Sequence, residues 1–336
     1  MPRGKLRGAD LVRAVMTASG RDESGAPGAL CAVEVADAHV AARLTRRAAT
    51  LSVAVAVSLA TLKLVAAMLT GSLAVLASVV DSLADVAASA ITWLSVRVAL
   101  RPADPIHRYG HGKAEALSAL VQAALVAGSG VFVLIDGVRR LLVPAPIEAP
   151  ELGFVVMGIS LAATVALVLH QRRIVRITRS QAIAADSAHY LSDISTNLAV
   201  LLSLALAGPL QMPRADPAIA AGIASWLLAA AWRIGRDAID TLMDRELDGA
   251  ERARIEALVR DHPMTRGLHD LRTRSAGRVR FIELHLELDG HLTLSEAHRI
   301  TDAIEQRLRA AFADAEVVIH QEPVGLADDR LDHRLG

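Results

Sequence analysis

Two pairs of side chains that can bind metal stand in the middle of long apolar stretches. Asp81 and Asp85 are four residues apart in one stretch, and His189 and Asp193 are four residues apart in another. Residues at i and i+4 share one face of a helix, so each pair presents its donors in one direction. Three carboxylates and one imidazole can surround a tetrahedral ion, and these donors suit zinc best, with related divalent ions next. The pairs predict a buried divalent-cation site; two unrelated polar pairs, buried for packing, are the alternative.

Placing the carboxylates of the first pair in an apolar stretch is energetically costly. A charge at the centre of a bilayer costs at least about 2.5–3.5 kcal/mol even on insertion scales. Two acids one turn apart also repel each other unless a cation or a proton lies between them. For Asp81 and Asp85 taken alone, an internal salt bridge remains the alternative. Small hydroxyl residues keep their surroundings mildly polar: Ser78, Ser82 and Ser89.

A polar loop follows the first pair and reads RPADPIHRYGHGK over residues 101–113. It contains three more candidate ligands, Asp104, His107 and His111. Their spacings of three and four are compatible with a turn that enters a helix. We expect a second, more exposed metal site here, although loop histidines that are merely solvated would give the same pattern.

The last third of the chain carries a further group of candidate ligands. They are His269, His285, His298 and His320, with Gln321 and Glu322 directly after. Three of these histidines fall on predicted strands or their ends and one on a predicted helix, so they could converge at one edge of a sheet. Solvated histidines are again the alternative.

The elements that must position these side chains are of two kinds. Hydrophobic residues make up 53% of the 336, and the formal net charge is zero. Crossing a bilayer takes about 20 mostly apolar residues. Six stretches qualify and predict six transmembrane helices, at about 48–70, 72–100, 114–142, 152–170, 182–207 and 217–234.

The basic residues indicate an orientation. Six spans leave both termini on one side, and the basic segments around 43–47, 101–113 and 172–179 all fall on that side. Because cytoplasmic loops carry an excess of Lys and Arg, both termini are predicted to be cytoplasmic.

Beyond about Leu242 the pattern becomes that of a small α+β domain, with the order helix, strand, strand, helix, strand. Capping signatures begin both helices, at Asp248 with Glu251 and at Thr293 with Glu296. Residues 279–289 alternate between apolar and polar, as a half-buried strand does. The predicted organisation is a disordered tail (1–42), a six-span transport domain (43–240), a cytoplasmic metal-binding domain (241–324) and a solvated tail (325–336).

Several classes of function lack their motifs. A single cysteine, Cys31, excludes an internal disulfide and any thiolate-rich metal cluster. No GxxxxGK[ST] sequence occurs, so no P-loop for ATP is expected. An intramembrane metalloprotease would need an HExxH-type site, which is also absent from the sequence.

Taken in order, these motifs resemble the cation diffusion facilitator family, in particular its bacterial zinc and ferrous-iron efflux branch. The resemblance covers about Arg43 to Val324 and rests on the two i,i+4 pairs, the PADPIHRYGHGKAEAL loop and the ending VVIHQEP. It implies that Asp81, Asp85, His189 and Asp193 form the transported-ion site and that Asp104, His107 and His111 form a loop site. It also implies a binuclear site in a ferredoxin-like cytoplasmic domain, from His269, His285, His298, His320 and Glu322.

The resemblance further implies a charged pair, Lys113 with Asp244, and a homodimer in the lipid of the bacterial inner membrane. Glu322 stands where that branch has aspartate, which would alter the spacing of two bridged ions. The expected activity is export of Zn²⁺, and also of iron(II), cadmium or cobalt, in exchange for protons by alternating access. A passive channel or an uptake permease with the same ligands is the alternative. No enzyme activity and no nucleic-acid partner are expected.

Overall fold

The computed structural model describes residues 27–70, 73–142, 151–207, 215–312 and 314–325. The described residues from Ala38 onward belong to one compact unit. The predicted N-terminal tail therefore lies outside the described residues up to residue 26, while residues 27–42 belong to a helix. Nearly all of the predicted C-terminal tail, from residue 326 on, also lies outside the described part.

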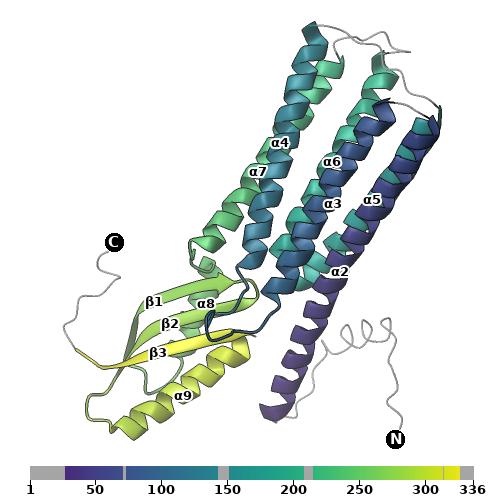
Figure 1. The fold of residues 1–336 in the computed structure, drawn as a ribbon. Helices are drawn as coiled ribbons and strands as arrows, with labels where there is room; N and C mark the ends of the chain where they lie inside the picture. Colours follow the sequence, from purple (N-terminus) through teal and green to yellow (C-terminus); the bar gives the residue numbers. More distant parts are fainter. Residues whose placement is uncertain (1–26, 71–72, 143–150, 208–214, 313, 326–336) are drawn as a thin grey trace, which may run out of the picture. The chain divides into compact units, whose positions relative to one another are not determined.

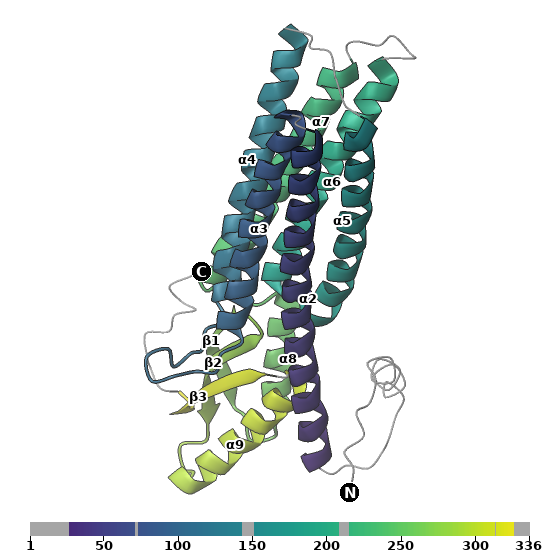
Figure 2. The ribbon, with the colours of Figure 1, turned by 45° about the vertical axis from the view of Figure 1, so that its right-hand side comes forward.

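Six long helices make up the apolar part of the chain. They are α2 (Pro27–Thr70), α3 (Leu73–Ala99), α4 (Ala114–Leu142), α5 (Glu151–Thr178), α6 (Gln181–Ala207) and α7 (Ala215–Leu242). Figures 1 and 2 show α3 to α7 side by side along most of their lengths. Each predicted apolar stretch thus forms one helix, and several helices extend beyond the stretch into polar residues.

Three of these helices are apolar and long enough to cross a membrane when only the described residues are considered. The qualifying segments are His39–Leu69, Ser78–Ala99 and Ala114–Arg139. The chain therefore has a helical domain suited to a bilayer, as the sequence predicted. Three of the six predicted spans meet the criteria of length and composition within the described residues.

Small residues let the helices approach each other closely, as is usual in membranes. A Cβ atom added at Gly130 of α4 would lie 3.2 Å from the Leu227 Cβ of α7. One added at Gly137, two turns further on, would lie 2.8 Å from the Ala220 Cβ. Gly128 has nothing within 4 Å at the same position, so only the glycines that face α7 serve this contact.

The C-terminal part has the predicted order of elements. It contains α8 (Gly249–Arg260), β1 (Gly267–Ala276), β2 (Val279–Leu288), α9 (Leu294–Ala311) and β3 (Ala315–Pro323). The sheet order is β1-β2-β3, with β1 and β2 antiparallel and β2 and β3 parallel. The described residues form a sheet of three strands. The C-terminal part shares the order of its elements with the predicted ferredoxin-like domain.

The predicted patterns explain how this small domain holds together. Four residues of β2 are buried as the alternation predicted, and they form one core with Ile255 and Val259 of α8 and Ile304 and Leu308 of α9. The four are Ile282, Leu284, Leu286 and Leu288. The capping box at Thr293 is present in full, because Thr293 and Glu296 each bond the other's backbone N–H.

Candidate metal-binding sites

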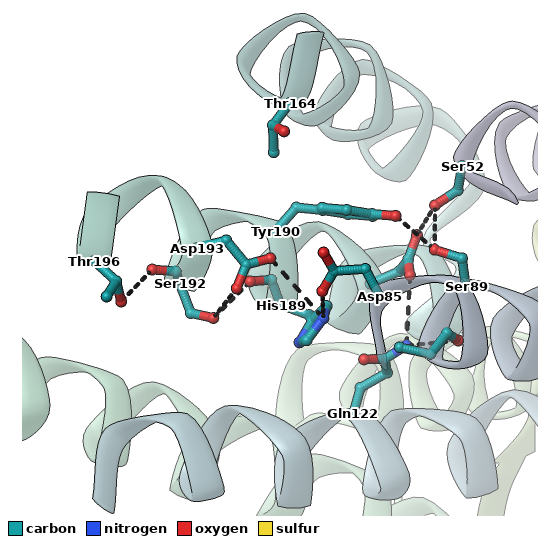
Figure 3. A network of polar contacts seen from close by, with 12 residues as sticks. Ser52, Asp85, Ser89, Gln122, Thr164, His189, Tyr190, Ser192, Asp193 and Thr196 are labelled. Carbon is teal, nitrogen blue, oxygen red and sulfur yellow. Dashed lines mark hydrogen bonds and ion pairs between the residues drawn. The ribbon is translucent and has the colours of Figure 1, made fainter. Parts of the chain in front are cut away.

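The first candidate site lies between α3 and α6. Single donor atoms of Asp85, His189 and Asp193 all lie within 4.8 Å of one another. His189 Nε2 is 3.3 Å from Asp85 Oδ1 and 3.9 Å from Asp193 Oδ2, so this nitrogen faces both carboxylates (Figure 3). His189 is buried and the two carboxylates are half-buried. One imidazole nitrogen with two carboxylates is a donor set that suits zinc and related divalent ions.

Asp81, the fourth residue predicted for this site, is not in the cluster. It lies one turn before Asp85 on α3, and its side chain is exposed. The i,i+4 spacing put the two acids on one side of the helix, but the structure brings only the second one to His189.

A second polar cluster, which the sequence analysis missed, surrounds Asp186 one turn before His189. Asp186 is fully buried. Its Oδ2 accepts hydrogen bonds of 2.6 Å from Ser52 Oγ and 2.6 Å from Gln171 Nε2. Its Oδ1 accepts weaker bonds of 3.4 Å from Thr92 Oγ1 and Gln122 Nε2. These donors come from α2, α5, α3 and α4, so one carboxylate on α6 joins five helices.

This cluster connects to the neighbourhood of the candidate ion site. Tyr190 OH lies 2.7 Å from Ser89 Oγ, and Ser89 Oγ lies 3.1 Å from Ser52 Oγ (Figure 3). Tyr190 directly follows His189, and their rings make an edge contact at 5.8 Å. The residue beside the candidate ligand is therefore tied to the same network as Asp186.

The second candidate site is in the loop between α3 and α4, where the sequence predicted it. Asp104 Oδ1 is 3.3 Å from His107 Nδ1, and Asp104 Oδ2 is 3.3 Å from His111 Nε2. The backbone N–H of His107 donates to Asp104 at 2.6 Å, which lowers the pKa of this exposed carboxyl. An ionised carboxylate with two histidines can hold a divalent ion.

The end of this loop packs against the C-terminal domain. A Cβ atom on Gly112 would collide with the Ala276 carbonyl at the end of β1, so only glycine fits there. The Arg274 guanidinium lies 4.8 Å from the Tyr109 ring and 4.1 Å from the Phe281 ring. The predicted charged pair is found beside it, because Lys113 Nζ lies 2.9 Å from Asp244 Oδ1.

The third candidate site is on the sheet of the C-terminal domain. Strand register places His269, His285 and His320 side by side across β1, β2 and β3. Glu322, two residues beyond His320, meets all three. Its carboxylate oxygens lie 3.3 Å from His269 Nε2, 2.6 Å from His285 Nδ1 and 3.4 Å from His320 Nε2. His269, His285 and Glu322 form a group whose donor atoms lie within 4.8 Å of one another.

Glu287 also belongs to this neighbourhood, although the sequence analysis did not select it. Its Oε1 lies 3.0 Å from His269 Nδ1, whereas Glu322 faces the other ring nitrogen, Nε2. Gly267 is paired with Glu287 in the sheet, and a Cβ atom there would collide with the Glu287 carboxylate. Histidines that bind metal through one nitrogen usually donate the other N–H to such a group. The alternation in β2, with Glu287 two residues after His285, was the signal that could have found it.

His298 lies apart from this group. It sits on α9 with 67% of its side chain exposed, and its Nε2 is 3.5 Å from Asp302 Oδ2. Within one chain, therefore, the structure brings together His269, His285, His320 and Glu322 but not His298.

Two family models match this chain, one over the helical part and one over the C-terminal part. Residues 49–243 match the family described as the cation efflux transmembrane domain, and residues 247–324 match the cation efflux protein cytoplasmic domain. The chain belongs to the cation diffusion facilitator family. It is therefore a transporter rather than an enzyme.

Two relatives show how far this similarity extends. The chain is 49% identical to the cation-efflux pump FieF of Shewanella oneidensis over 81% of this chain and 92% of that one. It is 46% identical to the pump of the same name from Pectobacterium atrosepticum, over 88% and 98%. The metal-bound C-terminal domain of the CzcD transporter from Thermotoga maritima covers 24% of this chain and 100% of its own, at 30% identity and a TM-score of 0.23.

Proposed function

We propose that this protein exports divalent metal ions from the bacterial cytoplasm in exchange for protons, with zinc as the main cargo. Iron(II), cadmium and cobalt have related ligand preferences and are included. The transporter works by alternating access as a homodimer in the inner membrane, with six spans and both termini in the cytoplasm. The domain limits are those expected from the sequence, with transport in 43–240 and metal binding in 241–324.

The observation that carries this proposal is the cluster of Asp85, His189 and Asp193 between two helices of the cation efflux domain. Ionisable residues at such positions are rare in membrane helices and mark ion or proton pathways. Asp81, one turn from Asp85, is proposed as the fourth ligand. The relatives named above are called cation-efflux pumps, which supports the direction of transport.

The ligands themselves can couple metal to protons. His189 must be neutral to bind metal, and the carboxylates must be ionised, so protons compete with metal for the same atoms. Metal entering from the cytoplasm displaces protons, and protons arriving from the other side displace the metal. Alternating exposure of the site to the two sides of the membrane then moves them in opposite directions.

The two further sites are proposed to assist this cycle. The loop site of Asp104, His107 and His111 would bind metal near the cytoplasmic surface. The site of His269, His285, His298, His320 and Glu322 would hold regulatory zinc, which supplies a cross-link between strands and favours the dimer. His285, His320 and Glu322 would supply nitrogen and oxygen donors to this zinc.

The test is zinc flux into proteoliposomes that contain the purified protein and an internal pH dye. Zinc uptake should be accompanied by movement of protons in the opposite direction. Collapsing the pH gradient and buffering the interior should slow zinc flux strongly. Unchanged flux under those conditions would favour the passive channel instead, and an Asp85→Ala protein with full flux would reject the proposed site.

A further inference from the structure

A lysine shares the small cavity that contains the carboxylates of the membrane cluster. The cavity has a volume of ≈ 40 Å³, room for about two or three waters. Lys63 of α2 lines it together with Asp85 of α3 and Asp193 of α6. Thr164 of α5 closes another side, and Figure 3 shows this residue across from Tyr190 and Asp193.

Lys63 is an unusual residue for its position. It lies inside the apolar segment His39–Leu69 and its side chain is half-buried. Ionisable residues in such segments generally face the interior of the bundle or a water-filled cavity, and they pair with one another. Lys63 and Asp193 line the same cavity, so a charged Lys63 attracts an ionised Asp193 carboxylate across it. Its place in the lining of this cavity distinguishes Lys63 from a lysine whose whole side chain lies at the membrane surface.

Lys63 lies nearer to one end of the helical bundle than Asp85 does. It lies seven residues before the end of α2 at Thr70, while Asp85 lies twelve residues after the start of α3 at Leu73. At 1.5 Å per residue, Lys63 is about 7 Å closer than Asp85 to the end of the bundle where α2 is followed by α3. Asn197, one turn beyond Asp193 on α6, lines the same cavity. Because the proposed function places both termini in the cytoplasm, this end of the bundle faces the opposite side of the membrane. Exported metal is released on that side.

We propose that Lys63 is a built-in counter-cation of the Asp85, His189 and Asp193 site. Its ammonium group repels a bound divalent ion and neutralises part of the carboxylate charge after the ion has left. Both effects favour release and oppose return of metal from the release side. This inference rests on the proposed function, because it assumes that the cluster binds the transported ion.

The test compares zinc binding and zinc flux for Lys63→Met, which keeps the length of the side chain and removes its charge. The full-length protein is used in a background with Asp104→Ala and His285→Ala, so that the other two sites do not obscure the result. The charge of Lys63, acting across this partly solvated cavity, should change zinc affinity by about tenfold. Lys63→Met should bind zinc about tenfold more tightly and turn over more slowly, with a lower KM and a lower maximal rate.

A second readout separates this role from a structural one. Zinc added on the release side should inhibit Lys63→Met at about one tenth of the concentration that inhibits the parent protein. Lys63→Arg keeps the charge and should stay close to the parent in both measurements. Thr61→Val, at an exposed position of the same helix, is the matched control and should change neither. If Lys63→Met does not fold, Lys63→Gln takes its place.

Two outcomes have different meanings. Equal affinity, KM and inhibition for Lys63→Met and the parent would overturn the inference, and Lys63 would be a lysine that reaches the membrane surface. If Asp85→Ala in the same background bound zinc as well as the parent, the cluster would not be the zinc site. That result would overturn the proposed function itself.

Discussion

Ser52 on α2 donates a hydrogen bond of 2.6 Å to Asp186 on α6, 134 residues later in the chain. Both side chains are fully buried. The same carboxylate oxygen accepts from Gln171, so two donors would lose their acceptor if Asp186 were removed. The network ties Asp186, one turn before His189, to helices on several sides of α6.

We expect Asp186→Ala to lower the stability of the protein by roughly 2–4 kcal/mol, because buried donors without a partner are expensive. Thermal unfolding in detergent would measure this as a midpoint lower by several degrees. Asp186→Asn should lose less, because one acceptor oxygen remains. Ser225→Ala, at an exposed position of α7, serves as the control. An unchanged midpoint for Asp186→Ala would mean that the network does not hold the helices together.

The imidazole of His189 should decide which metal is carried. A site of carboxylates alone suits harder, six-coordinate ions such as manganese, whereas one imidazole shifts the preference toward zinc. His189→Asp should therefore weaken zinc flux strongly while manganese flux is kept or gained. Asp85→Ala should lose both, and Asp104→Ala should lose much less. The three variants would be measured in one vesicle preparation. A His189→Asp protein that still carries zinc and rejects manganese would contradict the assignment.

Glu287 should strengthen metal binding at the sheet by holding the His269 ring so that its Nε2 faces Glu322. Loss of such a partner typically lowers metal affinity by about 10–100-fold. We expect that loss for Glu287→Ala and a smaller one for Glu287→Gln, in zinc titrations of the cytoplasmic segment. Glu283→Gln is the matched control, since this exposed residue of β2 lies outside the group. Equal affinities for Glu287→Ala and the control would show that His269 does not need this partner.

The cytoplasmic segment should fold alone and form a dimer that zinc strengthens. Its own core of residues from both helices and the sheet supports independent folding. Sedimentation of residues 241–336 with and without zinc would test this expectation. An identical association constant in the two conditions would leave the histidines without a role in dimerisation.

The ion pair of Lys113 with Asp244 should make the junction sensitive to acid. Burial alone would raise the pKa of Asp244, but Lys113 and Arg274 outweigh it and lower that pKa below its usual value. A carboxylate with a lowered pKa stabilises the folded state above its unfolded pKa of about 3.9, and this contribution is lost as the pH falls through the folded pKa. The pair is partly exposed, so the effect should be at most about 1 kcal/mol.

Unfolding curves between pH 7 and pH 3 would measure this dependence. Asp244→Asn should be less stable than the parent at pH 7, and the difference between the two should shrink below about pH 4. Arg245→Gln, which leaves the Lys113 pair in place, provides the comparison. A difference that stays constant across this range would mean that Asp244 contributes nothing through its charge.

Local features of the chain could be predicted from sequence because their causes are local. Apolar stretches long enough to cross a bilayer became helices, since such a stretch satisfies its own backbone only in this form. Thr293 and Glu296 cap α9 as expected, because a capping box is made by residues three apart. The loop ligands Asp104, His107 and His111 also meet as predicted, being held within one short turn.

Contacts between distant segments depended on packing that no local pattern contains. Register across three strands aligned His269, His285 and His320 with Glu322, and it also brought Glu287 to His269. The rotation of α3 turned Asp85 toward His189 and left Asp81 exposed, although both acids have the spacing of one helix face. No local pattern in the sequence predicted the partners of Asp186 or Lys63. Only the approach of neighbouring helices supplied their partners, because side chains far apart in sequence meet through tertiary packing.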